Sequence, residues 1–447
     1  MPISMSRQWS RRRLLTVLAA GAATLACGET GDGETDPVTI TAPSEPTPTP
    51  TQAASAVTAG VLTPRVLTPS SDTPSPATPS PATPAPVAPS PAVPTPDPND
   101  PDAALRRLDG YGFQAHIYNQ DRDLIVSRTL DAGFNWLKQQ VEWSQTEPIE
   151  KGGYDWRELD KVVAATSAAG LSLLLSVVRA PGWALGEGAH GPPADPEDFE
   201  DFMAAISSRY RGAVQAYELW NEANLSREWG YGRINAGEFV ELLLAGHRGV
   251  RAGDPDAVTI GGALTPAGDV DIPDQQVQAV DDVSFLRRMY EYNDGIVRDG
   301  FDAWGIHPGG FNNAPRQEIG SPRGDGWNGH ASFYFQRFTQ HRAVMEEFGD
   351  GAKPIWITEF GWSTANQDPA YGYGVDNSEA DQAEFLVDAI RLVREQYDYI
   401  THAFVWNLNF QSVVGPEDEK FPFGVLRPDG TPRPSYEALA AMHKGAV

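Results

Sequence analysis

Short apolar runs alternate with longer amphipathic segments along the C-terminal three quarters of this chain. The apolar runs contain five to seven residues and are rich in Val, Ile, Leu, Phe and Trp. Strands of a parallel sheet that is buried on both faces have this composition. The eight predicted strands cover 112–117, 136–141, 172–178, 216–220, 258–263, 303–307, 354–358 and 402–406.

The segments between these runs have the pattern of amphipathic helices. Several begin at acidic residues or Asn and end near Gly, as helix termini prefer. Eight strand–helix units in strict alternation predict an α/β fold, the (β/α)8 or TIM barrel, and one barrel accounts for residues 103–447. The predicted helices cover 121–132, 155–169, 196–210, 236–252, 282–299, 329–348, 377–397 and 434–443.

Two glutamates stand where predicted buried strands end. Residues 217–222 read Tyr-Glu-Leu-Trp-Asn-Glu, and residues 354–359 read Pro-Ile-Trp-Ile-Thr-Glu. Burying an unpaired carboxylate costs several kcal/mol, so a buried carboxylate normally has a partner or a function. Glu222 and Glu359 therefore predict one shared functional site. In a (β/α)8 barrel the catalytic groups come from the C-terminal ends of the strands. Two opposed carboxylates are the groups that glycoside hydrolysis uses.

The first hundred residues have a different composition. Residues 31–101 hold 19 of the 38 prolines, together with Thr, Ser and Ala and few large apolar residues. We therefore expect 28–102 to be a disordered linker of partly polyproline character. Before it, Arg11, Arg12 and Arg13 precede an apolar run, 14–26, that is too short to span a bilayer of ~30 Å. This pattern predicts an export signal over 1–27.

Cys27 is the only cysteine, which excludes an intramolecular disulfide and a metal–thiolate site. Residues 10–15 resemble a twin-arginine export signal. Residues 24–27 resemble a bacterial lipoprotein cleavage site, with Leu one position later than is usual there. The resemblance implies lipidation of Cys27 and a cell-surface or other extracytoplasmic location, with membrane contact only through that anchor. A plain cleaved signal peptide is the alternative.

The negative net charge of the chain limits the kinds of molecule that it can bind. The net charge is −26, and 29 basic and 51 acidic residues lie from position 103 onwards. Such a surface repels nucleic acid and anionic membranes. A neutral carbohydrate is an easier partner, although the charge also serves solubility alone. The oligomeric state stays open.

The globular part resembles the clan A retaining glycoside hydrolases, whose barrels carry the acid/base at strand four and the nucleophile at strand seven. Within the clan the chain is most similar to family 39, with families 5 and 10 as neighbours, and residues 138–148 favour family 39. One departure is that no Tyr follows closely after His307 at strand six. The motifs that carry the resemblance are 220–224 (Trp-Asn-Glu-Ala-Asn), 356–362 (Trp-Ile-Thr-Glu-Phe-Gly-Trp), Trp406 and 423–436.

The resemblance implies a retaining β-glycosidase that hydrolyses extracellular poly- or oligosaccharides by double displacement, with Glu222 as acid/base and Glu359 as nucleophile. The site should raise the pKa of Glu222 and leave Glu359 charged. Asn221 would donate to the sugar 2-hydroxyl, and the sugar would stack on Trp406. The chemistry implies no cofactor and no metal. Further candidates for substrate contact are His307, Lys138, His116, Arg179 and Trp183. His307 and Lys138 are alternatively candidates for holding Glu359 in position.

Other hypotheses remain open at this point. A barrel that binds carbohydrate without catalysis would share the fold, and a transglycosylase would share the covalent intermediate. A metal-dependent hydrolase would need a cluster of His and Asp, and the eight histidines have no His-x-His or His-Glu-x-x-His spacing. We expect Glu218 to pair with a basic residue inside the barrel. The sugar and the choice between internal and terminal cleavage stay open.

Overall fold

The computed structural model describes residues 105–186, 190–231, 233–272, 277–323, 330–365 and 369–445. The predicted export signal with Cys27 and the predicted linker over 28–102 lie outside the described residues. In the described part of the chain, no helix is both long enough and apolar enough to cross a bilayer.

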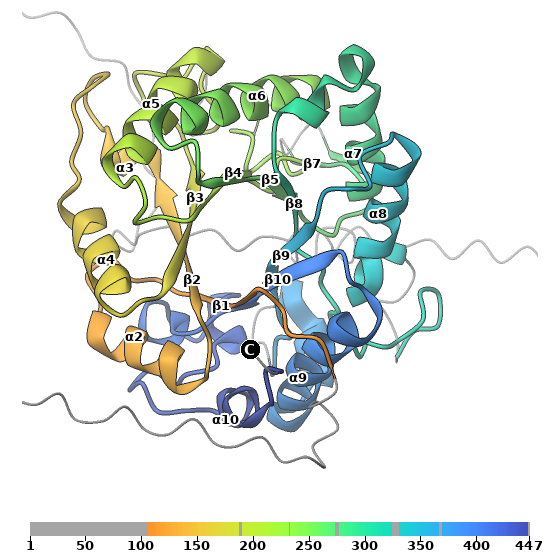
Figure 1. Ribbon diagram of the computed structural model, residues 1–447. Helices are drawn as coiled ribbons and strands as arrows, with labels where there is room; N and C mark the ends of the chain where they lie inside the picture. Colours follow the sequence, from red (N-terminus) through yellow and green to blue (C-terminus); the bar gives the residue numbers. More distant parts are fainter. Residues whose placement is uncertain are drawn as a thin grey trace, which may run out of the picture. The chain divides into compact units, whose positions relative to one another are not determined.

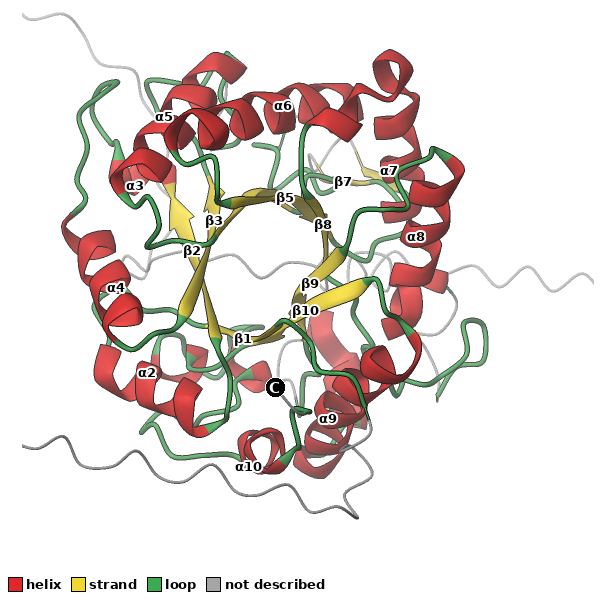
Figure 2. Ribbon diagram, viewed as in Figure 1, coloured by secondary structure: helices red, strands yellow, loops and turns green. Residues whose placement is uncertain are grey.

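Eight parallel strands close into a barrel, and helices surround it (Figures 1 and 2). The (β/α)8 prediction is confirmed, and every predicted apolar run overlaps one strand. The last strand pairs with the first, which closes the sheet. The barrel strands are β1 (Gly110–Gln114), β2 (Trp136–Glu142), β3 (Ser172–Val178), β4 (Ala216–Asn221), β5 (Val258–Leu264), β8 (Ala303–Ile306), β9 (Ile355–Phe360) and β10 (Ile400–Trp406).

The helices follow the strands in the predicted order. The α-helices around the barrel are α2 (Arg122–Asp131), α4 (Arg157–Ala168), α5 (Pro196–Arg209), α6 (Ala236–Gly253), α7 (Asp282–Glu291), α8 (Phe338–Glu347), α9 (Glu379–Gln396) and α10 (Pro434–Ala441).

Two predicted helices are shorter than expected. The segment 282–299 divides into α7 and a 3-10 segment, η2 (Tyr292–Asp299), because Asn293, Asp294 and Gly295 adopt left-handed backbone conformations. Asn, Asp and Gly tolerate this region better than other residues. Within 329–348 only α8 is α-helical, and the 3-10 turns η3 (Ala331–Phe333) and η4 (Phe335–Arg337) precede it.

Short elements that the hydrophobic pattern did not predict lie in the loops after the strands. The antiparallel hairpin of β6 and β7 pairs with the loop that follows β4, where Leu225 bridges to Ala279. These elements are too short to show a periodic pattern. They are α3 (Trp143–Thr146), β6 (Val270–Ile272), β7 (Val277–Ala279), η5 (Pro369–Asp376), η6 (Phe410–Ser412) and η7 (Phe421–Phe423).

Aromatic side chains fill the N-terminal half of the barrel interior. The ring of Trp356 stacks on His402 with centroids 3.5 Å apart, and Trp136 lies edge-on to Trp356 at 5.3 Å. A separate cluster, packed mainly between strands and helices, forms the larger core. Since apolar groups occupy this end of the barrel, polar interior groups are left for the C-terminal end of the strands. The interior cluster contains Trp136, Leu174, Ala216, Ile260, Ala303, Trp356 and Phe404.

Candidate active site

The strand register brings most of the predicted site residues to the C-terminal end of the barrel. Gln114, the last residue of β1, lies opposite Lys138 of β2 and Trp406 of β10. Asn221 ends β4, and Glu359 is the penultimate residue of β9. His307 follows β8 directly. The side chains therefore converge at the C-terminal end of the barrel, as the sequence predicts.

The end of β4 has an unusual backbone that aims the Glu222 side chain. Trp220 and Glu222 both have positive φ values, of 76° and 44°. Non-glycine residues rarely adopt such values, and those that do concentrate at functional sites. The backbone NH of Glu222 donates to the carbonyl of Ala263 at 2.8 Å, and Trp220 Nε1 donates to the carbonyl of Glu228 at 3.1 Å. These contacts hold the strained turn in place.

Glu222 and Glu359 meet across the barrel with His307 between them. His307 Nδ1 lies 3.0 Å from Glu222 Oε1, and His307 Nε2 lies 3.7 Å from Glu359 Oε1. One oxygen of each carboxylate lies within 4.8 Å of the other and of a His307 ring nitrogen. All three side chains are buried. Two residues 137 positions apart thus form one carboxylate pair, as expected.

Lys138 forms a buried ion triplet with two glutamates. Its ammonium Nζ lies 3.0 Å from Glu359 Oε1 and 2.7 Å from Glu218 Oε2. Lys138 and Glu218 have no exposed surface. The prediction that Glu218 pairs with a basic residue inside the barrel is confirmed. The triplet contains one positive charge and two carboxylates, so Glu359 shares the Lys138 ammonium with Glu218.

Burial and these neighbours set the protonation of the site. Burial raises the pKa of Glu222 well above its usual value, and the Glu359 charge adds to this while Arg227 opposes it. Burial raises the pKa of Glu359 to about 7, against the influence of Lys138. We expected the site to leave Glu359 charged, as an ordinary carboxylate is at neutral pH. Its raised pKa differs from that expectation, because the side chain is buried and burial disfavours the charged form. The ammonium contact still favours ionisation of Glu359 over Glu222.

His307 and Lys138 have opposite shifts. Burial and the nearby Lys138 charge lower the pKa of His307 well below its ordinary value, so its imidazole is neutral at neutral pH. Burial lowers the pKa of Lys138, but Glu218 and Glu359 outweigh that effect and raise it. Glu359 therefore has a permanent cation beside it, the Lys138 ammonium, whereas Glu222 has a neutral hydrogen-bonding partner, the His307 imidazole.

Lys138 and Gln114 both contact Glu359, the nucleophile candidate. The Gln114 side chain is a hydrogen-bond donor that lowers the pKa of Glu359. Arg227, whose NH2 lies 3.9 Å from Glu222 Oε2, and Thr265 also contact Glu222. Sequence reasoning missed Gln114, Arg227 and Thr265. Only the position of Gln114 at the end of the first strand could have indicated it.

Trp406 belongs to an aromatic cluster separate from the main core. Its ring lies 4.6 Å from Phe423 and 6.0 Å from Phe410, between centroids. Among the described residues, the buried Trp406 Nε1 and Asn221 Nδ2 have no hydrogen-bond partner. Buried polar atoms are normally paired, so these two atoms are available to a ligand. Both observations fit the predicted contacts of Trp406 and Asn221 with a sugar.

The remaining candidates lie nearer the rim. The ring of His116 lies edge-on to Phe410, and burial lowers the pKa of His116 to about 4. Arg179 has a φ of 59° and lies 3.8 Å from Glu142. Trp183 Nε1 donates to the carbonyl of Glu147 at 2.9 Å. Arg179 thus contacts the last residue of β2 and Trp183 the loop after it, and no contact in the described chain ties them to the carboxylate pair.

Glu222, His307 and Glu359 offer ligand atoms that could also surround a metal ion. A spacing rule could not find this group, because each residue comes from a different strand. A divalent cation there would lie beside Lys138 Nζ, which is 3.0 Å from the same Glu359 oxygen. Repulsion between the two cations disfavours that use of the site. The arrangement suits proton transfer and nucleophilic attack by carboxylates better.

Removing the charge of Glu218 should move the acidic limb of the pH–activity profile. Glu218 raises the pKa of Glu359 and shares Lys138 with it. In Glu218→Gln the cation faces Glu359 alone, so the pKa of Glu359 falls and the ionised form persists at lower pH. We expect the acidic limb of kcat/KM to shift down by about one pH unit or more. Glu384→Gln, an exposed change on α9, is the matched control.

An acidic limb that stays in place or rises in Glu218→Gln would contradict this electrostatic account. A thermal unfolding curve is needed beside it, because the substitution leaves an amide against the buried Lys138. Lost stability with an unmoved limb would assign Glu218 a purely structural role.

Comparisons with known proteins agree with the barrel. No protein-family model matches this chain, and no curated protein sequence matches it. A solved structure described as a family 39 glycoside hydrolase from the gut symbiont Bacteroides cellulosilyticus WH2 is similar, with 21% identity and a TM-score of 0.57. The match covers 76% of this chain and 64% of that one.

A glucosidase structure from Croceicoccus marinus is similar as well, with 14% identity and a TM-score of 0.52. That match covers 75% of this chain and 67% of the glucosidase. This chain spans less than two thirds of the family 39 structure. At these identities the similarity establishes a shared fold, the (β/α)8 barrel, and the assignment of a reaction rests on the geometry of the site.

Proposed function

We propose that the barrel is a retaining β-glycosidase that hydrolyses O-glycosidic bonds of poly- or oligosaccharides. The observation that carries the proposal is the pair Glu222 and Glu359, with oxygens within 4.8 Å at the C-terminal end of the barrel. Retaining glycosidases place their carboxyl groups about 5–5.5 Å apart, whereas inverting enzymes leave about 6.5–9.5 Å for a water. The short separation supports the retaining class.

In the first step Glu359 attacks the anomeric carbon as a carboxylate. The bond from that carbon to the leaving oxygen breaks as Glu222 gives its proton to that oxygen. The product is a glycosyl ester on Glu359. Burial keeps a proton on Glu222 near neutral pH, and the Lys138 ammonium favours the charged form of Glu359. The environment thus supports this division of roles.

In the second step Glu222, now ionised, removes a proton from water. The water oxygen bonds to the anomeric carbon as the ester bond breaks, which restores the Glu359 carboxylate and the Glu222 acid. His307 Nδ1, 3.0 Å from Glu222 Oε1, can donate to the ionised form of Glu222 between the two steps. Its neutral state at neutral pH means that it stabilises this charge without adding a cation.

We place the sugar at the cleavage point between Trp406 and Asn221. An aromatic face packs against the CH groups of a sugar ring. Asn221 Nδ2 has no hydrogen-bond partner among the described residues, so it can donate to the hydroxyl on the carbon next to the anomeric carbon. Such a contact strengthens as the transition state forms. The acidic surface favours a neutral glycan, and the export signal predicted over 1–27 supports a substrate outside the cytoplasm.

The test is hydrolysis of aryl β-glycosides and soluble β-glycans by the full chain, with the product anomer followed by proton NMR. We expect the β-anomer to form first and then to mutarotate. The α-anomer as first product would exclude double displacement. Binding of glycans with no turnover across the panel would instead favour a carbohydrate-binding barrel.

A further inference from the structure

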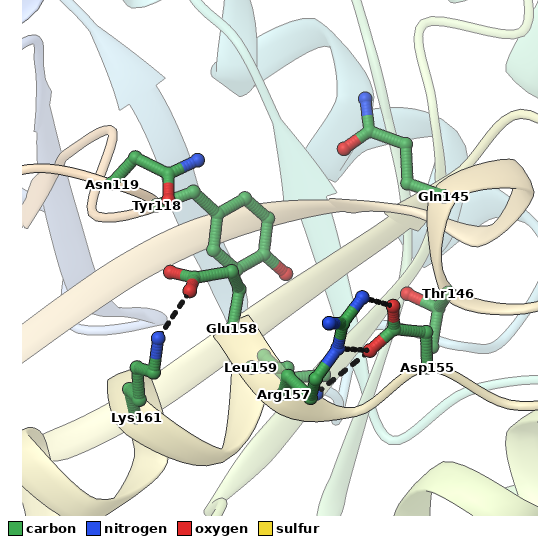
Figure 3. A pocket seen from close by; sticks show the side chains of 9 residues that line it. All are labelled: Tyr118, Asn119, Gln145, Thr146, Asp155, Arg157, Glu158, Leu159 and Lys161. Carbon is green, nitrogen blue, oxygen red and sulfur yellow. Dashed lines mark hydrogen bonds and ion pairs between the residues drawn. The ribbon is translucent and has the colours of Figure 1, made fainter.

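A pocket of about 310 Å³ lies in the loops that follow β1 and β2 and does not include Glu222 or Glu359 (Figure 3). Because these loops leave the C-terminal ends of their strands, the pocket lies at the same end of the barrel as the carboxylate pair. Its volume is at the lower end of the range of ligand sites. Its walls are Tyr118 and Asn119, then Gln145, Thr146 and Asp155, and the start of α4 with Arg157, Glu158, Leu159 and Lys161.

A row of aromatic rings connects the pocket to the candidate active site. From Trp406 the row passes to Phe410, with centroids 6.0 Å apart. The next steps are 6.4 Å from Phe410 to His116 and 6.2 Å from His116 to Tyr118. Tyr118 is the member of the row that lines the pocket. The row therefore places the pocket several ring lengths from Trp406. Trp406, Phe410 and His116 are buried, so Tyr118 is the ring of the row that is partly exposed to a ligand in the pocket.

The charges around the pocket are already paired with one another. Arg157 Nε donates to Asp155 Oδ1 at 2.8 Å. Glu158 binds Lys161 Nζ at 2.5 Å and Arg122 NH2 at 2.5 Å. Figure 3 shows the Arg157 and Lys161 pairs along one wall. Among the residues that line the pocket, Asp155 and Glu158 are balanced by Arg157 and Lys161, so the lining itself carries no net charge that would attract an ionic ligand.

Two polar groups beside these pairs are not used within the described chain. Neither the Tyr118 hydroxyl nor the Asn119 amide has a side-chain hydrogen-bond partner there, and Asn119 is exposed. The two lie across the pocket from Gln145 in Figure 3. Asn119 has a φ of 55°, and its backbone NH bonds to Glu158, which fixes the loop. An aromatic ring beside a free hydroxyl and a free amide matches the alternating CH and OH groups of a neutral sugar.

We propose that this pocket is a remote subsite that binds a neutral glycan chain whose other end occupies the carboxylate pair. The inference rests on the proposed function and extends it, because such a subsite selects oligosaccharides of several units over disaccharides and aryl glycosides. Binding energy from a remote part of the substrate then assists cleavage at Glu222 and Glu359.

The test is the double variant Tyr118→Phe/Asn119→Gly in the full chain. It removes the Tyr118 hydroxyl and the Asn119 side-chain amide. Phe keeps the aromatic ring at position 118, and Gly adopts the left-handed backbone of position 119 without strain. The matched control is Asn293→Gly, which makes the same change at an exposed Asn with a φ of 47° after α7. The measurement is kcat/KM for β-1,4-linked gluco-, xylo- and manno-oligosaccharides of two to six units and for the corresponding aryl monoglycosides.

We expect kcat/KM for the longest active oligosaccharide to fall about tenfold in the double variant, with the aryl glycoside unchanged. The control should match the wild type on every substrate. An equal fall on both substrates, or none on either, would overturn the subsite. A wild type that cleaves the aryl glycoside but gains nothing from chain length would also overturn it and leave the proposed function intact.

If no substrate is cleaved by the wild type, the proposed function fails, and calorimetric titration with the three hexasaccharides then decides on the pocket. Binding that weakens in the double variant, and not in Asn293→Gly, would retain the subsite as a glycan-binding site. Absent or unaffected binding would overturn it. If the double variant proves unstable, Tyr118→Phe alone is the replacement, with the same substrates and the same criteria.

Discussion

Glu359→Ala should reduce kcat/KM by about 10⁵-fold and leave the fold intact. The substitution removes the group that attacks the anomeric carbon, and no other carboxylate can replace it, because Glu218 is turned to Lys138. The barrel should survive because Lys138 keeps Glu218 as a partner, and burial already raises the pKa of Glu359 to about 7. Removing a carboxylate that is costly to bury does not weaken the core. Activity with the aryl glycoside that the wild type cleaves and thermal unfolding are the two measurements.

Adding azide to Glu359→Ala distinguishes loss of the nucleophile from loss of the folded active site. The small anion can enter the space left by Glu359 and attack the anomeric carbon of a β-glycoside from the same side, so the product should be the α-glycosyl azide. Glu437→Ala on α10 is the matched control, since it removes a carboxylate of the same size at a distance from the site. Full activity in Glu359→Ala would refute the assignment of the nucleophile.

Glu222→Ala should reduce kcat/KM for glycans by about 10²–10⁴-fold, the usual contribution of a general acid and base. The loss should be much smaller for an aryl glycoside with a strongly acidic phenol, because that leaving group needs no proton. Burial keeps Glu222 protonated, so the basic limb of the pH profile reports its ionisation. That limb should disappear in the variant. The measurement is kcat/KM against leaving-group pKa and against pH.

The product with azide separates this variant from the previous one. In Glu222→Ala the glycosyl ester on Glu359 still forms, so azide attacks from the opposite side and should give the β-glycosyl azide. Equal losses for good and poor leaving groups would contradict the role of Glu222 as acid. Glu228→Ala, on the same loop, tests whether removing another buried carboxylate near Arg227 has a comparable effect.

The shape of the barrel follows from local sequence patterns. Each apolar run predicted a strand to within a few residues, since a strand buried on both faces must be apolar along its whole length. The helices were predicted well where one amphipathic pattern continues, as in 196–210, which forms α5 (Pro196–Arg209). The segment 282–299 was predicted as one helix because the pattern continues across Asn293, although three left-handed residues break the helix there.

The identity of the two central carboxylates was also available from the sequence. Glu222 and Glu359 each interrupt an apolar strand at its end, and charge in that position requires a partner or a function. The pairing of Glu218 was predictable in kind, because an acidic residue in a strand interior needs a cation. The sequence did not determine that this cation would be Lys138, shared with Glu359, because pairing between β2, β4 and β9 depends on how the barrel closes.

What the sequence by itself determined is the set of elements and the residues that are costly to bury, because both depend on residue type and on spacing along the chain. Tertiary structure alone decided the electrostatics. It placed His307 between the carboxylates, gave Glu359 the contacts of Lys138 and Gln114, and enclosed it so that its pKa rises to about 7. These properties depend on distances across the barrel and on exclusion of water, and neither is a function of local sequence.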